Sequence, residues 1–187
     1  MARMRFSRDY RESVVLGNGC RLRFRLVRPK DAPLLVQIFE QLSPEARYQR
    51  FFAHKNALSP ADLRTLTDCD GTNHLAIAAV ADTGAGEEGV GVARFVRMRE
   101  DPCAAEVALA VVDARRREGI GGKLVGRLSE AAAERGIRRL HYLVLADNLP
   151  MKGLMQKVAP HAARGDSRVH GAMISTFVVP LAASGRR

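Results

Sequence analysis

The residues best suited to chemistry lie in one short, basic and glycine-rich stretch of the 187-residue chain. It contains, in order, Arg115, Arg116, Arg117, Gly119, Gly121, Gly122 and Lys123. An apolar run ends before it and a helical apolar pattern follows, so we expect a strand, a turn and a helix. Glycines at a helix N-terminus let a ligand approach backbone N–H groups that have no partner within the helix. Together with the helix dipole and the cationic side chains, this stretch predicts a pyrophosphate site.

Two well-known phosphate-binding motifs do not fit this stretch. A Walker A loop needs G-x-x-x-x-G-K-[ST], whereas here Arg117 stands at the first glycine position and Leu124 follows Lys123. A Rossmann motif needs G-x-G-x-x-G directly after a strand. Leu124 occupies its third glycine position, and six residues, 113–118, separate the preceding apolar run from Gly119. Neither a P-loop NTPase nor a dinucleotide-binding enzyme is therefore indicated.

The stretch does fit the pattern R/Q-x-x-G-x-G/A, as Arg116-Arg-Glu-Gly-Ile-Gly121. In this it resembles the acetyl-CoA-binding loop of the GNAT (Gcn5-related N-acetyltransferase) superfamily. The resemblance extends over nearly the whole chain beyond about residue 22, including 131–140 and Asn148-Leu-Pro-Met151 downstream. More narrowly, 28–31, Leu42-Ser-Pro-Glu-Ala-Arg-Tyr-Gln-Arg-Phe-Phe52 and the strand with Glu106 resemble bacterial Pat-type protein-lysine acetyltransferases.

The resemblance implies a fold and a reaction. The fold is mixed α/β, with a central, mostly antiparallel twisted sheet of six to seven strands flanked by helices. The reaction passes an acetyl group from acetyl-CoA directly to an amine, either a small molecule or a protein lysine, without a metal. Because a lysine with a pKa near 10.4 is protonated at pH 7, the reaction needs a base. Glu106 matches the base of Pat-type enzymes, although the sequence alone allows an ordinary solvent-facing strand residue.

The same resemblance assigns residues to the cofactor. Backbone groups of the strand after Glu106 are expected to bond the pantetheine arm, and the glycine-rich stretch the pyrophosphate. Asn148 matches an asparagine that contacts the cofactor, although it also suits the N-cap of a helix, and one residue can do both. The expected cofactor-binding residues are Leu109, Ala110, Val111, Val112, Arg116, Arg117, Gly119, Ile120, Gly121, Gly122, Lys123, Asn148 and Met151.

One departure from the family concerns the departing thiolate. Many GNAT enzymes carry a tyrosine in the helix after the asparagine, where this chain has Leu154 and Met155. Pat-type enzymes also lack that tyrosine, so the general acid is unassigned and water is a candidate. Tyr142 is expected to be a packing residue. The usual Gly-Phe end of that helix is replaced by Val158-Ala-Pro-His161, which leaves the local geometry of the acceptor site open.

Apolar periodicity and turn residues predict the elements that hold these positions. A strand is expected at 22–27, followed by helices whose N-termini are capped at Asp31, Ser43 and Ser59. A three-strand meander follows at 74–80, 90–96 and 105–112, and then a helix over 119–135. A strand at 139–145, a helix over 148–158 and one or two strands within 168–179 complete the chain. These elements predict a single mixed α/β domain over 22–187, which the resemblance identifies as a GNAT domain, preceded by a basic N-terminal arm over 1–21.

Composition excludes several classes of protein. The formal net charge is +10, and residues 1–30 hold nine Lys and Arg against two acidic residues. Such a balance favours anionic partners, although a solvated basic surface explains the N-terminal cluster more simply. No apolar run approaches the roughly 20 residues of a membrane span, and no secretory signal follows the basic start. Three scattered cysteines and five scattered histidines indicate neither disulfides nor a metal site, so we expect a cytoplasmic protein.

Three functions remain open at this point. The first is the acetyltransferase, for which the family makes a homodimer plausible. The second is a non-catalytic module that binds or senses acyl-CoA and has lost the acceptor chemistry. The third, ranked last, is a nucleic-acid-binding domain that uses the basic N-terminus. Only Phe6, Tyr10 and Phe24 supply aromatic rings there, and no nucleic-acid-binding motif is present.

Overall fold

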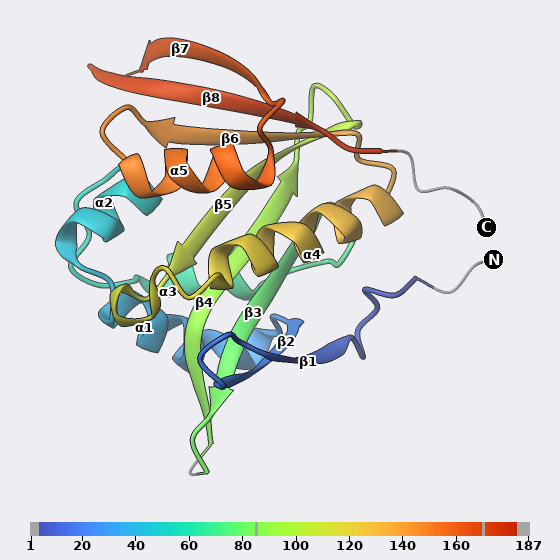
Figure 1. Ribbon diagram of the computed structural model, residues 1–187, viewed down its shortest axis with the longest axis vertical. Coiled ribbons are helices and arrows are strands. Elements are labelled where there is room, and N and C mark those ends of the chain that lie inside the picture. Colours follow the sequence, from blue (N-terminus) through green and yellow to red (C-terminus); the bar gives the residue numbers. More distant parts are fainter. Residues whose placement is uncertain (1–3, 85, 170, 183–187) are drawn as a thin grey trace.

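A single mixed sheet forms the centre of the protein in the computed structural model, which describes residues 4–84, 86–169 and 171–182. Within these residues eight strands lie in the order β1-β2-β3-β4-β5-β6-β8-β7 (Figure 1). The strands are β1 (Arg11–Val15), β2 (Arg21–Leu26), β3 (His74–Asp82), β4 (Glu87–Arg97), β5 (Ala104–Val111), β6 (Arg139–Leu145), β7 (Ala163–Val169) and β8 (Ala172–Pro180). Of the described strand pairs, only β5 and β6 are parallel. The predicted mixed, mostly antiparallel fold is confirmed, with one strand more than the upper estimate.

Five helices of the described residues flank this sheet: α1 (Ala32–Glu40), α2 (Pro44–Phe51), α3 (Pro60–Thr67), α4 (Ile120–Glu134) and α5 (Leu149–Val158). Helix α4 packs on β3, β4 and β5, and α5 packs on α4; both lie in front of the sheet in Figure 1. Helix α1 packs on β4 and α2 packs on β5. Leu124 and Leu128, which belong to the helical apolar pattern after the glycines, are fully buried on α4. The sheet is therefore covered on both faces near β4 and β5.

The N-terminal cap predictions succeed for α2 and α3 and fail for α1. The hydroxyl oxygens of Ser43 and Ser59 accept hydrogen bonds from the third backbone N–H of their helices, at 3.2 and 3.1 Å. Asp31 precedes α1 but makes no side-chain cap. Its buried carboxylate instead accepts hydrogen bonds from the Arg25 guanidinium on β2, at 2.7 and 3.0 Å. The same carboxylate also accepts from the backbone N–H of Arg28 at 2.8 Å, so the Arg25 guanidinium and the turn before α1 hold it away from the first N–H groups of that helix.

The segment before residue 22, expected only as a basic arm, is joined to the domain. It forms β1, which pairs antiparallel with β2, and Phe6 is fully buried in the core. The hydroxyl of Tyr10 donates to the Glu12 carboxylate at 2.8 Å, and Arg127 of α4 donates to the same carboxylate at 3.1 Å. Residues 1–3 of the predicted arm and His170 lie outside the described residues. The described part of the arm thus packs as an integral edge of the fold.

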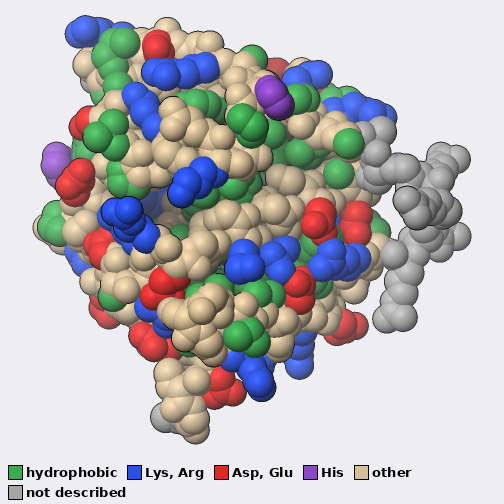
Figure 2. Space-filling view, in the orientation of Figure 1, with side chains coloured by type: hydrophobic (Ala, Val, Ile, Leu, Met, Phe, Trp, Pro, Cys, Tyr) green, Lys and Arg blue, Asp and Glu red, His purple; other side chains and the backbone are tan. Residues whose placement is uncertain are grey.

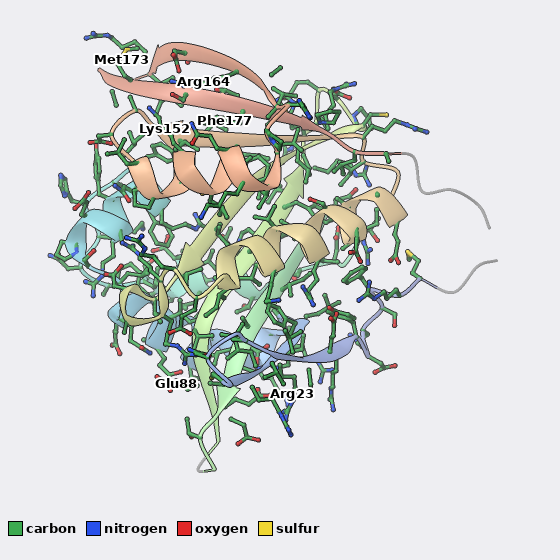
Figure 3. The ribbon with its side chains drawn as sticks, in the orientation of Figure 1. Arg23, Glu88, Lys152, Arg164, Met173 and Phe177 are labelled. Carbon is green, nitrogen blue, oxygen red and sulfur yellow. The ribbon has the colours of Figure 1, made fainter. Side chains whose placement is uncertain are left out.

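The other edge of the sheet is formed by β7, which begins earlier than the predicted closing strands. All its residues are exposed, and it pairs only with β8 among the described strands. The guanidinium carbon of Arg164 on β7 lies 5.7 Å from the centroid of the Phe177 ring on β8 (Figure 3). This cation–π contact covers an aromatic ring near the edge of the sheet.

Candidate active site

The sheet opens between its two parallel strands. Pairing joins Ala104–Val107 of β5 to Arg139–Tyr142 of β6 and then stops. Both strands continue, β5 to Val111 and β6 to Leu145, and Figure 1 shows them spreading apart beyond that point. The second half of β5 therefore borders a gap in the sheet.

Backbone groups of β5 point into this gap. The N–H of Val112 donates to the carbonyl oxygen of Val90, at 3.0 Å. Since hydrogen-bonding direction alternates along an antiparallel ladder, the backbone of Ala110 also faces β4, while that of Leu109 and Val111 faces the opposite side. On that side β6 has already diverged. The N–H and C=O groups of Leu109 and Val111 are thus left for a ligand, because buried backbone groups need partners.

A cavity of about 1120 Å³ occupies the opening. Figure 2 shows a hollow on the left of the molecule, with Lys and Arg side chains at its rim. A small-molecule pocket usually measures about 300 to 1000 Å³, so this one suits a long ligand. Its wall includes twelve of the fourteen residues that the sequence analysis assigns to the site: Glu106, Leu109, Ala110, Val111, Arg116, Arg117, Gly119, Ile120, Gly121, Gly122, Asn148 and Met151.

The other two assigned residues lie outside the cavity wall. Val112 is 1% exposed and belongs to the apolar core, and its N–H is committed to β4. Lys123 lies in the first turns of α4, and its carbonyl oxygen accepts a hydrogen bond from Arg127. Both residues are neighbours of cavity residues in the sequence, but the sequence alone does not show toward which side each one points.

The N-terminus of α4 forms one wall and is left unsatisfied. Gly119 is the N-cap residue, with a φ of +82° that favours glycine, and no side chain caps the helix. Gly119, Ile120, Gly121 and Gly122 all line the cavity. A Cβ added to Gly121 would meet Leu154 Cδ2 at 3.3 Å, which is tighter than an ordinary contact. Free N–H groups, the helix dipole and close backbone access together provide an anion site.

The three arginines before this helix have different roles. Arg115 bonds the Glu118 carboxylate at 2.9 Å, and the hydrogen bond from Arg115 lowers the pKa of Glu118. Arg116 pairs with Asp113 at 2.5 Å. Arg117, whose φ is +65°, makes no ion pair or hydrogen bond to the described residues. The guanidinium of Arg117 is therefore available to a ligand, while the partners of Arg115 and Arg116 hold the loop.

Glu106 stands at the other end of the cavity wall on β5. Its side chain is exposed, and no described residue donates a hydrogen bond to its carboxylate. The antiparallel register pairs Glu106 with Val96 and Ala108 with Arg94, so the side chains of Glu106, Arg94 and Ala108 share one face of the sheet. The carboxylate is thus free to accept a proton from a molecule in the cavity.

Asn148 and the first turn of α5 form the wall opposite α4. The Asn148 side-chain oxygen accepts from the N–H of Met151 at 3.0 Å, so the helix-cap function is confirmed. Its amide nitrogen has no partner in the described part of the chain, which leaves one donor for a ligand. Leu154 lines the cavity, Met155 is buried, and Tyr142 is 1% exposed. Burial raises the pKa of Tyr142, as expected for a packing residue.

Helix α2 contributes cavity residues that the sequence analysis left without a function. They are Ala46, Gln49, Arg50, Phe51 and Phe52, and Lys157 of α5 joins them. The resemblance over 42–52 marked this segment, but only the structure, in which α2 packs on β5, shows that it lines the same cavity as Glu106. Among the described residues, no group of His, Cys, Asp and Glu side chains could hold a metal ion, and no helix is long and apolar enough to cross a membrane.

Comparisons with known proteins agree with this geometry. The sequence model of the acetyltransferase (GNAT) family matches residues 35–159. The Acetyltransferase Pat of Mycolicibacterium smegmatis is 32% identical over 142 residues, 76% of this chain and 42% of that protein. The Acetyltransferase PA5475 of Pseudomonas aeruginosa is 28% identical over 140 residues, 74% of each chain. The crystal structure of the GNAT domain of S. lividans PAT covers 91% of this chain and 97% of that one, with a TM-score of 0.81 and 30% identity. The chain therefore matches less than half the length of the first of these relatives.

Proposed function

This chain belongs to the acetyltransferase (GNAT) family, and we propose that it transfers an acetyl group from acetyl-CoA to an amine. One observation carries the proposal: a single cavity joins the open side of β5, the uncapped N-terminus of α4 and the free carboxylate of Glu106. These three features suit the pantetheine arm, the diphosphate and the acceptor amine in turn. The acceptor is a small-molecule amine or a protein lysine.

The residues present fit the donor. The first-turn N–H groups of α4 and the free guanidinium of Arg117 bind the diphosphate as a charge-assisted site. The backbone groups of Leu109 and Val111 bind the pantetheine amides in place of a neighbouring strand. Asn148 and Met151 of α5 close the other side. Lys123, outside the cavity wall, adds only its charge at longer range.

Glu106 acts as the base in this proposal. The neutral nitrogen of the acceptor attacks the thioester carbonyl carbon, an N–C bond forms, and the C–S bond breaks with its electron pair going to sulfur. Glu106 takes the proton that the nitrogen loses, directly or through water. The thiolate is protonated by water, since Leu154 and Met155 stand where other family members have a tyrosine. The products are an acetylated amine and CoA.

The experiment that tests this function measures thiol release from acetyl-CoA with a panel of amines and with protein acceptors. Glu106→Gln is expected to lower kcat by roughly 10²-fold, because general-base catalysis contributes about 10² to 10⁴. The affinity for CoA is expected to change by less than about twofold, because Glu106 lies outside the proposed diphosphate and pantetheine contacts. Glu100→Gln, an exposed glutamate on the loop between β4 and β5, is the matched control.

Two outcomes contradict the proposal in different ways. An unchanged kcat in Glu106→Gln removes that carboxylate from the mechanism. Tight CoA binding without thiol release for any acceptor favours the non-catalytic acyl-CoA-binding module instead. Mass spectrometry of a cell lysate incubated with acetyl-CoA and the protein identifies the modified amines.

A further inference from the structure

Two arginines near Glu106 form no salt bridge with any acidic residue in the described part of the chain. Arg50 of α2 lines the large cavity, and its guanidinium makes no hydrogen bond or ion pair to the described residues. Arg94 of β4 is only 5% exposed. Its Nη1 donates to the carbonyl oxygen of Leu66 at 3.0 Å and contacts His74 Nε2 at 3.1 Å, while its buried Nε has no hydrogen-bond partner in the described part of the chain. Two cationic groups are therefore held at the acceptor end of the site with no salt bridge to a described carboxylate, and Glu106 acts on Arg50 only through its charge.

The fold brings Arg94, Arg50 and Glu106 into one region of the molecule. Arg94 lies opposite Ala108 in the β4–β5 register, on the sheet face that carries Glu106 and that α2 covers. Arg50 lines both the large cavity and a small chamber of about 20 Å³ behind it, whose wall includes Arg94 and Ala110. Arg50 thus stands between the buried Arg94 and the open cavity.

The electrostatics agree with this arrangement. Burial and then the charge of Arg94 lower the pKa of Arg50, while the charge of Glu106 raises it. An arginine remains protonated in proteins, so these effects measure how poorly its charge is neutralised rather than a loss of the proton. A guanidinium in such a place binds a carboxylate strongly, with two parallel charge-assisted hydrogen bonds.

We propose that Arg50 binds a carboxylate carried by the acceptor, next to the amine that Glu106 deprotonates. This inference rests on the proposed function and narrows its substrate class. The acceptor is then an amino acid, or a peptide amine beside an acidic residue, with its amine toward Glu106 and its carboxylate toward Arg50. Arg94 is a positioning residue, since its buried charge strengthens the field at Arg50 without reaching the large cavity.

The donor is a less suitable source of this carboxylate. The diphosphate of acetyl-CoA is already assigned to the N-terminus of α4 and Arg117. The chamber behind Arg50 has room for about one water molecule, so it cannot take the end of a longer acyl chain. The small side chains of Ala108 and Ala110 and the open cavity leave the space in front of Arg50 to the acceptor.

The test compares acceptors that differ only in a carboxylate or a carboxamide. It uses free amino acids against their amides, and lysine peptides flanked by Glu against the same peptides flanked by Gln. We expect kcat/KM for the free amine to be about 10- to 100-fold higher for the carboxylates, since a hydrogen-bonded charge pair supplies that range. Comparison of the two acceptor sets shows whether the carboxylate that Arg50 binds belongs to a free amino acid or to an acidic residue of a peptide.

Arg50→Met is expected to lower the ratio of kcat/KM between carboxylate and carboxamide acceptors to about 1. Arg50→Lys is expected to restore part of this ratio. Arg64→Met, which removes the same charge from an exposed position of α3, is expected to keep the preference intact. Equal loss for carboxylate and carboxamide acceptors in Arg50→Met contradicts the inference. So does a preference for succinyl-CoA over acetyl-CoA that Arg50→Met abolishes, because the carboxylate then belongs to the donor.

Failure of this inference is distinguishable from failure of the proposed function. CoA binding by calorimetry and thiol release with carboxamide acceptors report the proposed function alone. Activity without carboxylate preference overturns only the inference. Absence of thiol release with every acceptor overturns the proposed function and the inference with it.

Discussion

The N-termini of α4 and α5 border the same cavity and are built in opposite ways. Helix α5 begins with Asn148, whose side-chain oxygen accepts from the N–H of Met151. Helix α4 begins with Gly119, which has no side chain to cap its free N–H groups. A capped N-terminus needs nothing further, while an uncapped one in a cavity wall needs an external acceptor. The contrast teaches that the missing cap on α4, more than its dipole, marks the ligand site.

The residues around the two helix N-termini differ in the same way as the caps. Next to α4, Arg117 keeps a strained positive φ, and its guanidinium has no partner among the residues that the structure describes, while its neighbours Arg115 and Arg116 are paired with acidic residues. At α5 the first residue, Leu149, is exposed and apolar, and Pro150 supplies no N–H to be satisfied. The cavity wall at α4 thus offers cationic and N–H donors to an anion, whereas the backbone N–H groups at the start of α5 already have their partners.

The largest expected effect comes from placing a charge at the uncapped end. Gly121→Glu puts an anion where the diphosphate is proposed to bind, and its side chain meets Leu154 and Leu109. We expect CoA affinity to fall by at least about 100-fold, measured by calorimetry, because like charges repel strongly at close range. Gly126→Glu is the control, since that glycine is exposed on the same helix and a Cβ there meets nothing within 4 Å.

Normal CoA binding by a folded Gly121→Glu protein would contradict the assignment of this loop. Circular dichroism of both variants shows whether α4 still forms. If Gly121→Glu does not fold, Gly121→Ala gives a second measurement, because a single methyl group only presses on the flexible end of Leu154.

A smaller effect is expected at the capped end. Asn148→Ala removes the cap of α5 and is expected to cost about 1 kcal/mol of unfolding free energy, or about 2 to 4 °C in Tm. Asn148→Ser keeps a capping oxygen and is expected to retain most of that stability, measured by thermal unfolding. A drop in CoA affinity in the serine variant shows that the asparagine amide also contacts the cofactor. Equal stability of all three proteins contradicts the cap assignment.

The smallest effect concerns a capped helix remote from the cavity. Asp62 of α3 accepts from Lys55 at 2.8 Å and from the N–H of Ser59 at 2.9 Å. The hydrogen bond from Lys55, followed by those from Ser59, lowers the pKa of Asp62 to about 2 from an ordinary value of 3.8. A lowered carboxyl pKa stabilises the folded protein above the ordinary value, and this stability is lost as the pH falls toward 2.

Asp62→Asn isolates this charge, because asparagine still accepts the N–H bond. The Tm difference between the native protein and the variant is expected to be largest near pH 5 and to shrink between about pH 4 and 2. Thermal unfolding in a pH series measures it. A difference that stays constant over that range shows that the charge of Asp62 does not contribute.

Local patterns made the α4 loop and the Asn148 cap predictable, since both depend on residues a few positions apart. Asp31 was mispredicted because its partner, Arg25, comes from a different element. Strand β1 escaped prediction because Arg11-Glu-Ser-Val-Val15 lies at a sheet edge and shows no alternation of apolar and polar residues. Arg50 required the packing of α2 against β5, a contact between segments far apart in the chain.

The gap between β5 and β6 has a consequence for how the protein would work in a cell. Under the proposed function, the backbone groups of Leu109 and Val111 would bind the pantetheine arm that acetyl-CoA and CoA have in common, so acetyl transfer would not by itself weaken binding of the CoA product. Spent CoA therefore competes for the same opening, and the rate should follow the balance between charged and spent carrier rather than the amount of acetyl-CoA alone. If the proposed function holds, the gap in the sheet would make the rate of acetyl transfer depend on the ratio of acetyl-CoA to CoA.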